Sequence, residues 1–344
     1  MKKPFSKILA MLPLAVVCSC SQETVGDSAQ AFGDEHVSFA VTDGSARTRA
    51  ALSGTSSLDA GFGVSSSAYT TGTYATQPCG SYFHDITALP DVPTIYYWPV
   101  SGYNISFYAY YPKGSSALAV SSKETVGAPV YTYTVPTDNA AQLDVMTAQR
   151  TDMPCSDPKK VELSFTHHCS DIRFTAYNQG TVPLTVNSIS IYGVKYTGTL
   201  KEGTWTLSDT QNSPALNPFT LTFSKTVAAD ATEDLTGTSG HFIMIPQTIA
   251  AGTQVFVVTT TENGKAKTYT HTLEAPETWA AGKSYGYKLI LGDGILTVDP
   301  ETDIQDWAPN ADSLTTSADT DGDFSQKPVG GAVDDGINDW TEQQ

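Results

Sequence analysis

Three adjacent residues, His167-His168-Cys169, have side chains that could bind a metal ion or serve as a nucleophile and its base. They lie between two alternating runs, Val161-Glu162-Leu163-Ser164-Phe165 and Ile172-Arg173-Phe174-Thr175-Ala176, which are typical of strands. Adjacent residues of a strand point to opposite faces, so the two histidines could share one ion only at a bulge. The pattern therefore favours packed or hydrogen-bonded histidines over a metal or catalytic site.

A second cluster of chemically capable residues is Asp319-Thr320-Asp321-Gly322-Asp323, which spaces carboxylates as a calcium loop does. An EF-hand loop requires Gly at its sixth place and Glu at its twelfth, where this chain has Phe324 and Gly330. A solvated acidic run is the better interpretation. The sequence also has no nucleophile elbow, phosphate loop or zinc-spaced cysteine set, so we expect no enzyme, no cofactor and no metal.

The N-terminus predicts export. Residues 1–19 combine three lysines with an apolar run that is too short to span a bilayer, which indicates a secretory signal peptide. Val17-Cys18-Ser19-Cys20 resembles a lipobox, in which the cysteine after the cleavage site receives a lipid. Cys20 is the better candidate because the small Ser19 precedes it, and its acyl chains, palmitate among them, would tether the protein to a membrane. The alternative is an ordinary signal peptide with incidental cysteines.

Two of the four arginines of the chain, Arg47 and Arg49, lie in the polar stretch Ser45-Ala46-Arg47-Thr48-Arg49-Ala50. An exposed linker of this kind is an accessible target for an arginine-specific protease. The alternative is a solvated loop that carries two positive charges.

Composition limits the remaining classes. The net charge of −17 argues against nucleic acid as a partner. With 344 residues the chain is long enough for two domains. Besides the two cysteines near the signal peptide only Cys79, Cys155 and Cys169 remain, so at most one disulfide can form among them, and which pair it would join stays open.

Hydrophobic periodicity predicts an all-β fold. In residues 105–111, Ile105, Phe107, Ala109 and Tyr111 alternate with Ser106, Tyr108 and Tyr110, which predicts a half-buried strand that pairs with residues 95–99 as a hairpin. The run from His36 to Val41 predicts another strand. Asn263-Gly264 between two alternating runs predicts a second hairpin. Residues 310–344 hold eight acids and one base and cannot form a core of their own.

The order and spacing of these elements resemble the fimbrillin family, the subunits and accessory proteins of type V pili on anaerobic Gram-negative bacteria. The resemblance runs from about Phe39 to Trp307. The motifs that carry it are Tyr97-Trp98-Pro99, Phe107-Tyr108-Ala109-Tyr110-Tyr111-Pro112, Val135-Pro136, Gln142-Leu143-Asp144-Val145-Met146-Thr147-Ala148, Val161-Glu162-Leu163-Ser164-Phe165-Thr166-His167 and Ile172-Arg173-Phe174.

The resemblance implies two transthyretin-like β-sandwich domains in tandem. We expect a signal peptide at residues 1–19, a lipidated tether at 20–35, an N-terminal domain at 36–159, a C-terminal domain at 160–309 and an acidic tail at 310–344. It also implies a location at the outer membrane and cell surface, in fimbriae, and a role in cell adhesion with a host or bacterial surface ligand as a further partner. Whether the subunit belongs to the stalk, the anchor or the tip stays open.

For polymerising members the family implies cleavage after an arginine, with Arg49-Ala50 as the matching position and Arg47 as the second option. Loss of residues 20–49 would remove the strand around Val37 and open a groove, which a strand of another fimbrial subunit could fill. The tail is the candidate donor. The alternative function is a surface lipoprotein that never polymerises and binds a glycan or another ligand, with Trp98, Trp205 and Trp279 as a stacking platform, although their places in alternating strands favour the core.

Overall fold

The computed structural model describes residues 32–43, 57–70, 80–99, 102–122, 127–156, 159–236, 240–292, 295–300 and 305–306. The predicted signal peptide, Cys20, Arg47, Arg49, Ala50 and the acidic tail lie outside these residues. The described part of the chain is all-β, as predicted, and its only helices are the short 3-10 turns η1 (Ser57–Ala60) and η2 (Asn139–Ala141). In these same residues no helix has the length and apolar character needed to cross a membrane.

A six-stranded sheet with the order β2-β10-β9-β6-β3-β4 forms one part of the fold. Its neighbours are antiparallel except for β2 and β10, which run parallel. A two-stranded pair, β1 and β5, accompanies it. The bounds are β1 Phe32–His36, β2 Phe39–Asp43, β3 Phe62–Tyr69, β4 Gly80–Ala88, β5 Tyr97–Pro99, β6 Asn104–Tyr111, β9 Met146–Pro154 and β10 Val161–His167.

The predicted hairpin between residues 95–99 and 105–111 is wrong. β6 lies between β3 and β9, whereas β5 pairs with β1. β5 ends at Pro99, which has no N–H to extend a ladder toward β6. The prediction of a half-buried β6 is also wrong, because Phe107 lies in one hydrophobic core while Tyr110 on the opposite face lies in another.

Four further sheets make up the rest of the described fold, with orders β14-β13-β8-β7, β16-β11-β22-β23 (β17 and β24 attached), β15-β12-β19-β20 and β18-β21. The bounds are β7 Leu118–Val120, β8 Tyr131–Thr134, β11 Ser170–Asn178, β12 Leu184–Ile191, β13 Thr197–Lys201, β14 Thr204–Leu207, β15 Phe219–Val227, β16 Ala231–Asp234, β17 Phe242–Met244, β18 Gln247–Ile249, β19 Gln254–Glu262, β20 Lys265–Thr272, β21 Glu277–Trp279, β22 Lys283–Gly292, β23 Ile295–Pro300 and β24 Gln305–Asp306.

The hairpin predicted from Asn263-Gly264 is confirmed. β19 and β20 pair antiparallel on either side of it, and the backbone φ angles are 49° at Asn263 and 71° at Gly264. Only Gly and, less readily, Asn adopt this left-handed region at low cost, which is why the dipeptide specifies a tight two-residue turn.

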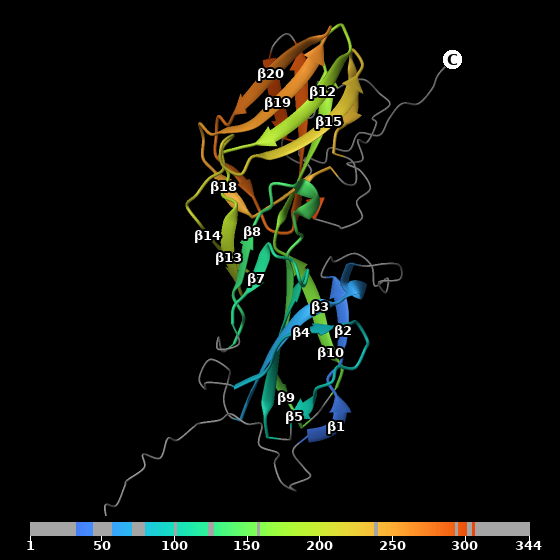
Figure 1. Ribbon diagram of the computed structural model, residues 1–344, viewed down its shortest axis with the longest axis vertical. Helices are drawn as coiled ribbons and strands as arrows, with labels where there is room; N and C mark the ends of the chain where they lie inside the picture. Colours follow the sequence, from blue (N-terminus) through green and yellow to red (C-terminus); the bar gives the residue numbers. More distant parts are fainter. Residues whose placement is uncertain are drawn as a thin grey trace, which may run out of the picture.

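Buried hydrophobic side chains fall into two clusters. The first core runs from Val37 to Phe165 and the second from Tyr110 to Leu291. Figure 1 shows β12, β15, β19 and β20 at one end of the molecule, β1 and β5 at the other, and β7, β8, β13 and β14 between them. Pairing crosses the boundary predicted between residues 159 and 160 in both directions, because β10 pairs with β2 and β9 while β8 pairs with β13.

Candidate functional site

Residues 32–43, comprising β1, β2 and the two residues between them, form what we call the inserted segment. Val37 and Phe39 have no exposed surface, whereas Ser38 and Ala40 are half-buried and Thr42 is exposed. The alternation predicted between His36 and Val41 is therefore confirmed in its central part. The inserted segment contributes to the first core although it comes before Arg47 and Arg49 in the sequence.

An aromatic pocket holds Phe39. Its ring packs edge to face against Phe62, at a centroid distance of 5.9 Å, and against Phe107, at 5.5 Å. Phe62 in turn packs edge to face against Phe165 at 5.4 Å. Such pairs contribute roughly 0.5–1.5 kcal/mol each beyond the burial of apolar area. β3, β6 and β10 thus build a pocket that the inserted segment fills.

On one edge the inserted segment pairs with β10. The parallel register runs from Val161 opposite Phe39 to Phe165 opposite Asp43. At the start of this ladder the Val161 N–H donates to the Ser38 carbonyl at 2.9 Å. Backbone hydrogen bonds therefore hold the segment at this edge, and they do not depend on its side chains.

On the other edge lie residues 89–97, the connection between β4 and β5 together with the first residue of β5, which we call the strap. The Val37 N–H donates to the Tyr96 carbonyl, the Thr94 N–H to the Val37 carbonyl and the Asp91 N–H to the Phe39 carbonyl, each at 2.8 Å. Pro90 and Pro93 have no N–H and interrupt a regular ladder. Although β2 is the last strand of its sheet, the stretch from Val37 to Phe39 is bonded on both sides.

Two polar contacts flank the segment. Lys160, just before β10, forms an ion pair with Asp91 of the strap at 2.8 Å, and both side chains are at least half exposed. His36 Nδ1 lies 2.6 Å from the Thr94 carbonyl, and the imidazole packs on Tyr97 with centroids 4.1 Å apart. The ion pair joins the strap to β10 without involving the segment. An exposed pair of this kind contributes at most about 1 kcal/mol.

In the sequence, the predicted processing residues come shortly after the embedded strand β2. Arg47 and Arg49 follow the end of β2 at Asp43 within a few residues of sequence, outside the described residues. A backbone cut after either arginine would leave the inserted segment attached by non-covalent contacts alone.

The histidines of His167-His168-Cys169 have separate partners, as the sequence predicted. His167 Nδ1 lies 2.7 Å from Asp144 Oδ2, and His168 Nε2 lies 2.7 Å from Thr147 Oγ1. Burial, followed by the charge of His167, lowers the pKa of His168 to about 4. Burial raises the pKa of the Cys169 thiol. Among the residues that the structure describes, no group of three or more acidic, His or Cys side chains could hold a metal ion.

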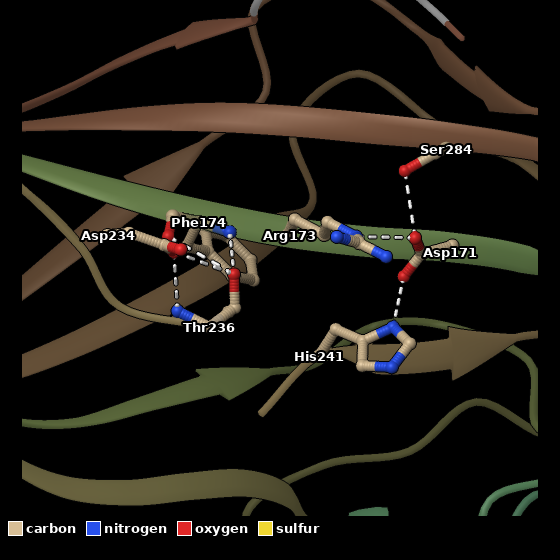
Figure 2. Close-up of polar contacts among 7 residues, drawn as sticks. All are labelled: Asp171, Arg173, Phe174, Asp234, Thr236, His241 and Ser284. Atoms are coloured by element: carbon tan, nitrogen blue, oxygen red, sulfur yellow. Dashed lines mark hydrogen bonds and ion pairs between the residues drawn. The ribbon is translucent and has the colours of Figure 1, made fainter. Parts of the chain in front are cut away.

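Sequence reasoning missed a buried polar cluster around Asp171 (Figure 2). The Asp171 carboxylate has no exposed surface and accepts hydrogen bonds from His241 Nδ1, from Arg173 Nε at 2.6 Å and from Ser284 Oγ at 2.8 Å. Burial alone would raise the pKa of Asp171, but the hydrogen bond and charge of His241, together with Arg173, outweigh it and lower the pKa. Nearby, Thr236 Oγ1 accepts from the Phe174 N–H at 3.1 Å.

Ser284, His241 and Asp171 are the residue types of a nucleophilic triad, yet their connections differ from one. In a triad the base contacts the nucleophile and the acid orients the base. Here Ser284 donates to Asp171 itself. The carboxylate is therefore the centre of a structural network that joins β11, β22 and the residue before β17.

The described cysteines, Trp98 and Trp279 are buried, and Trp205 is partly buried. Cys155 and Cys169 are both free and buried, and they lie in different cores, so they do not pair with each other. Cys79 lies outside the described residues. Trp98 and Trp279 are each 1% exposed, so neither offers a ring to a sugar, and Trp205 donates its Nε1–H to the His168 carbonyl at 2.7 Å.

The described strands define an all-β protein whose core is completed by its own N-terminal segment. A model of the Fimbrillin-like family matches residues 48–307. This match covers more than half of the sequence, so the chain belongs to the fimbrillin-like family, and the predicted resemblance is confirmed. Membership supports a structural subunit of fimbrial type at the cell surface.

Solved structures share the fold at low sequence identity. A fimbrial protein from Bacteroides vulgatus ATCC 8482 has a TM-score of 0.56 at 16% identity, over 79% of this chain and 99% of its own. A candidate cell adhesion protein from Bacteroides ovatus ATCC 8483 has a TM-score of 0.50 at 15% identity, over 81% of this chain and 99% of its own. The tip fimbrial protein Mfa3 from Porphyromonas gingivalis is more distantly similar, with a TM-score of 0.37 at 10% identity, over 72% of this chain and 94% of its own. No functionally curated protein matches the chain.

Proposed function

We propose that this protein is a subunit of cell-surface fimbriae that is exported as a lipoprotein and assembles by exchanging its inserted segment for a strand of a neighbouring subunit. One observation carries the proposal: Val37 and Phe39 are core residues, yet they lie on the N-terminal side of Arg47 and Arg49. A single cut therefore separates part of the core from the rest of the chain.

The steps follow from the chemistry of the groove. A lipid on Cys20 holds the exported chain at the outer membrane until a protease cuts after Arg49, with Arg47 as the second option. Departure of the inserted segment leaves the Val161, Thr94 and Asp91 N–H groups and the Tyr96 carbonyl without their partners. These groups then form an open strand edge, and the emptied Phe39 pocket exposes apolar surface to water. An incoming strand that restores the bonds and the apolar contacts is therefore strongly favoured.

The tail at residues 310–344 is the proposed donor. Fully extended, the residues after Asp306 reach roughly 125 Å at about 3.3 Å per residue, long enough to join one molecule to the next. We place this exchange in a protein of two tandem sandwich domains, with β10 in the first domain and β7 and β8 in the second, as the two cores suggest. The assembled fimbriae contribute to adhesion to a host or bacterial surface.

Two experiments test the proposal. The N-terminus of the protein isolated from the cell surface should be Ala50, and a protein with both Arg47→Ala and Arg49→Ala should keep an acylated Cys20 and fail to assemble. A protein that ends at Trp307 should fold, accept a strand and fail to donate one. Assembly of the double arginine variant at the wild-type level would refute processing, and assembly of truncated protein alone would refute the tail as donor.

A further inference from the structure

Exposed apolar side chains are concentrated in the strap. The large hydrophobic residues that stand out from the described surface are Leu89, Val92, Ile95, Tyr97, Tyr103 and Leu216. The first four belong to residues 89–97, and Ile95 is the most exposed at 82%. Isolated exposed apolar residues are ordinary, whereas a large exposed apolar surface marks an interaction site; here four such side chains fall within nine residues. We call Leu89, Val92, Ile95 and Tyr97 the strap patch.

The backbone of the strap is held in place. Its inner side bonds the inserted segment through Asp91, Thr94 and Tyr96, and Pro90 and Pro93 restrict its backbone angles. A surface fixed in this way loses little conformational entropy when a partner binds. The strap patch is therefore preorganised on the wall of the same groove that receives a strand.

We propose that the strap patch is the surface on which the body of a second copy of this chain docks when the strand of that copy fills the groove. The inference rests on the proposed function and extends it from the exchanged strand to the body that follows it. A strand of the second copy that sits between β10 and the strap tethers the body of that copy near the groove wall. The strand also raises the effective concentration of that subunit, so a small apolar contact is sufficient.

The distribution of charge indicates where two copies of this chain can meet. The chain carries a net charge of −17, so two copies repel each other over most of their surfaces. Asp91 is the only charged residue of the strap, and Lys160 pairs with it. The strap patch is thus a neutral and apolar place at which two acidic molecules can meet.

The test compares Ile95→Asp and Val92→Asp with Leu216→Asp, a matched control at a leucine that is 45% exposed outside the strap. Protein cleaved after Arg49 and freed of the fragment is measured in two ways: uptake of a synthetic peptide of residues 32–43, and assembly with intact full-length chain. We expect all variants to bind the peptide within about twofold of wild type. Assembly should fall at least tenfold for the two strap variants and stay unchanged for Leu216→Asp.

Each result is decisive. If Ile95→Asp assembles at the wild-type level, the inference is overturned. The same result would be obtained if the strap patch bound a different kind of protein. Failure of every cleaved protein to take up the peptide refutes the exchange groove itself, and the inference falls with it. Ile95→Ser, which removes apolar area without adding a charge, should weaken assembly in the same direction and so exclude an effect of the added charge alone. Uptake of the peptide by each variant excludes a folding defect.

Discussion

The ring of Phe39 packs edge to face against the ring of Phe107, with their centroids 5.5 Å apart. Phe39 belongs to the inserted segment, and Phe107 belongs to β6, which lies inside the six-stranded sheet. The contact joins a part of the chain that processing would remove to a part that stays. Its strength therefore bears on both the stability of the unprocessed protein and the release of the segment.

Replacing Phe39 by Ala should lower the free energy of unfolding by about 3–5 kcal/mol, because it empties a fully buried aromatic site. Urea denaturation measures the change. Thr42→Ala, at an exposed position of the same strand, should stay within about 0.5 kcal/mol of wild type. A loss below about 1 kcal/mol for Phe39→Ala would mean that the segment adds little to the core.

Stability should fall between pH 6.5 and pH 4 because of His168. Its pKa is lowered from 6.5 to about 4 by burial and by the charge of His167, so the unfolded chain binds the proton more readily than the folded one. The stability that comes from the lowered pKa of His168 is fully present above pH 6.5 and is lost as the pH falls toward 4. The total loss is at most on the order of 3 kcal/mol. Urea midpoints at pH 7, 5.5 and 4.5 measure the loss.

The matched variant for this effect is His168→Gln, which can still hydrogen-bond Thr147 but does not titrate. Its stability should change less over the same interval. Asp171 complicates the profile only at lower pH, because its lowered pKa means that its contribution is lost below the ordinary carboxylate range. Equal slopes for wild type and His168→Gln would show that another group causes the loss.

Two aspartates in ion pairs should differ widely in their effect on stability. Asp171→Ala should cost about 3–5 kcal/mol, because the carboxylate is fully buried and Arg173, His241 and Ser284 would all lose this hydrogen-bond acceptor. Asp91→Ala should cost at most about 1 kcal/mol, because its pair with Lys160 is exposed. Thermal or urea unfolding at pH 7 measures both, and similar costs would contradict the structural role assigned to the Asp171 network.

Local patterns predicted the strands well. The alternation in Val161-Glu162-Leu163-Ser164-Phe165 became β10, and Asn263-Gly264 became the turn between β19 and β20. A period of two tells which face of a strand is buried, but it does not identify the neighbouring strand. This is why residues 95–99 and 105–111 were wrongly paired and why the parallel contact of β2 with β10 could not be predicted.

Both the Asp171 cluster and the groove of the inserted segment depend on contacts between residues far apart in the sequence. His241 and Ser284 lie 70 and 113 residues from Asp171 in the sequence, so nothing local marks that carboxylate as buried. The strap was equally hidden, because Pro90 and Pro93 give it the pattern of a loop although its backbone bonds the inserted segment. Close packing also explains why residue 63 is a glycine, because a Cβ at Gly63 would lie 1.9 Å from the ring of Tyr110.

Locking the inserted segment in place tests strand exchange most directly. Ala40 and Glu162 are register partners in the parallel pair of β2 and β10, so the double variant Ala40→Cys/Glu162→Cys can join the segment to the groove by a disulfide. After cleavage following Arg49, this double variant should stay monomeric when oxidised and assemble when reduced. Wild type cleaved in the same way should assemble under both conditions. Equal assembly of the oxidised and reduced forms would contradict strand exchange, since the segment would then not need to leave.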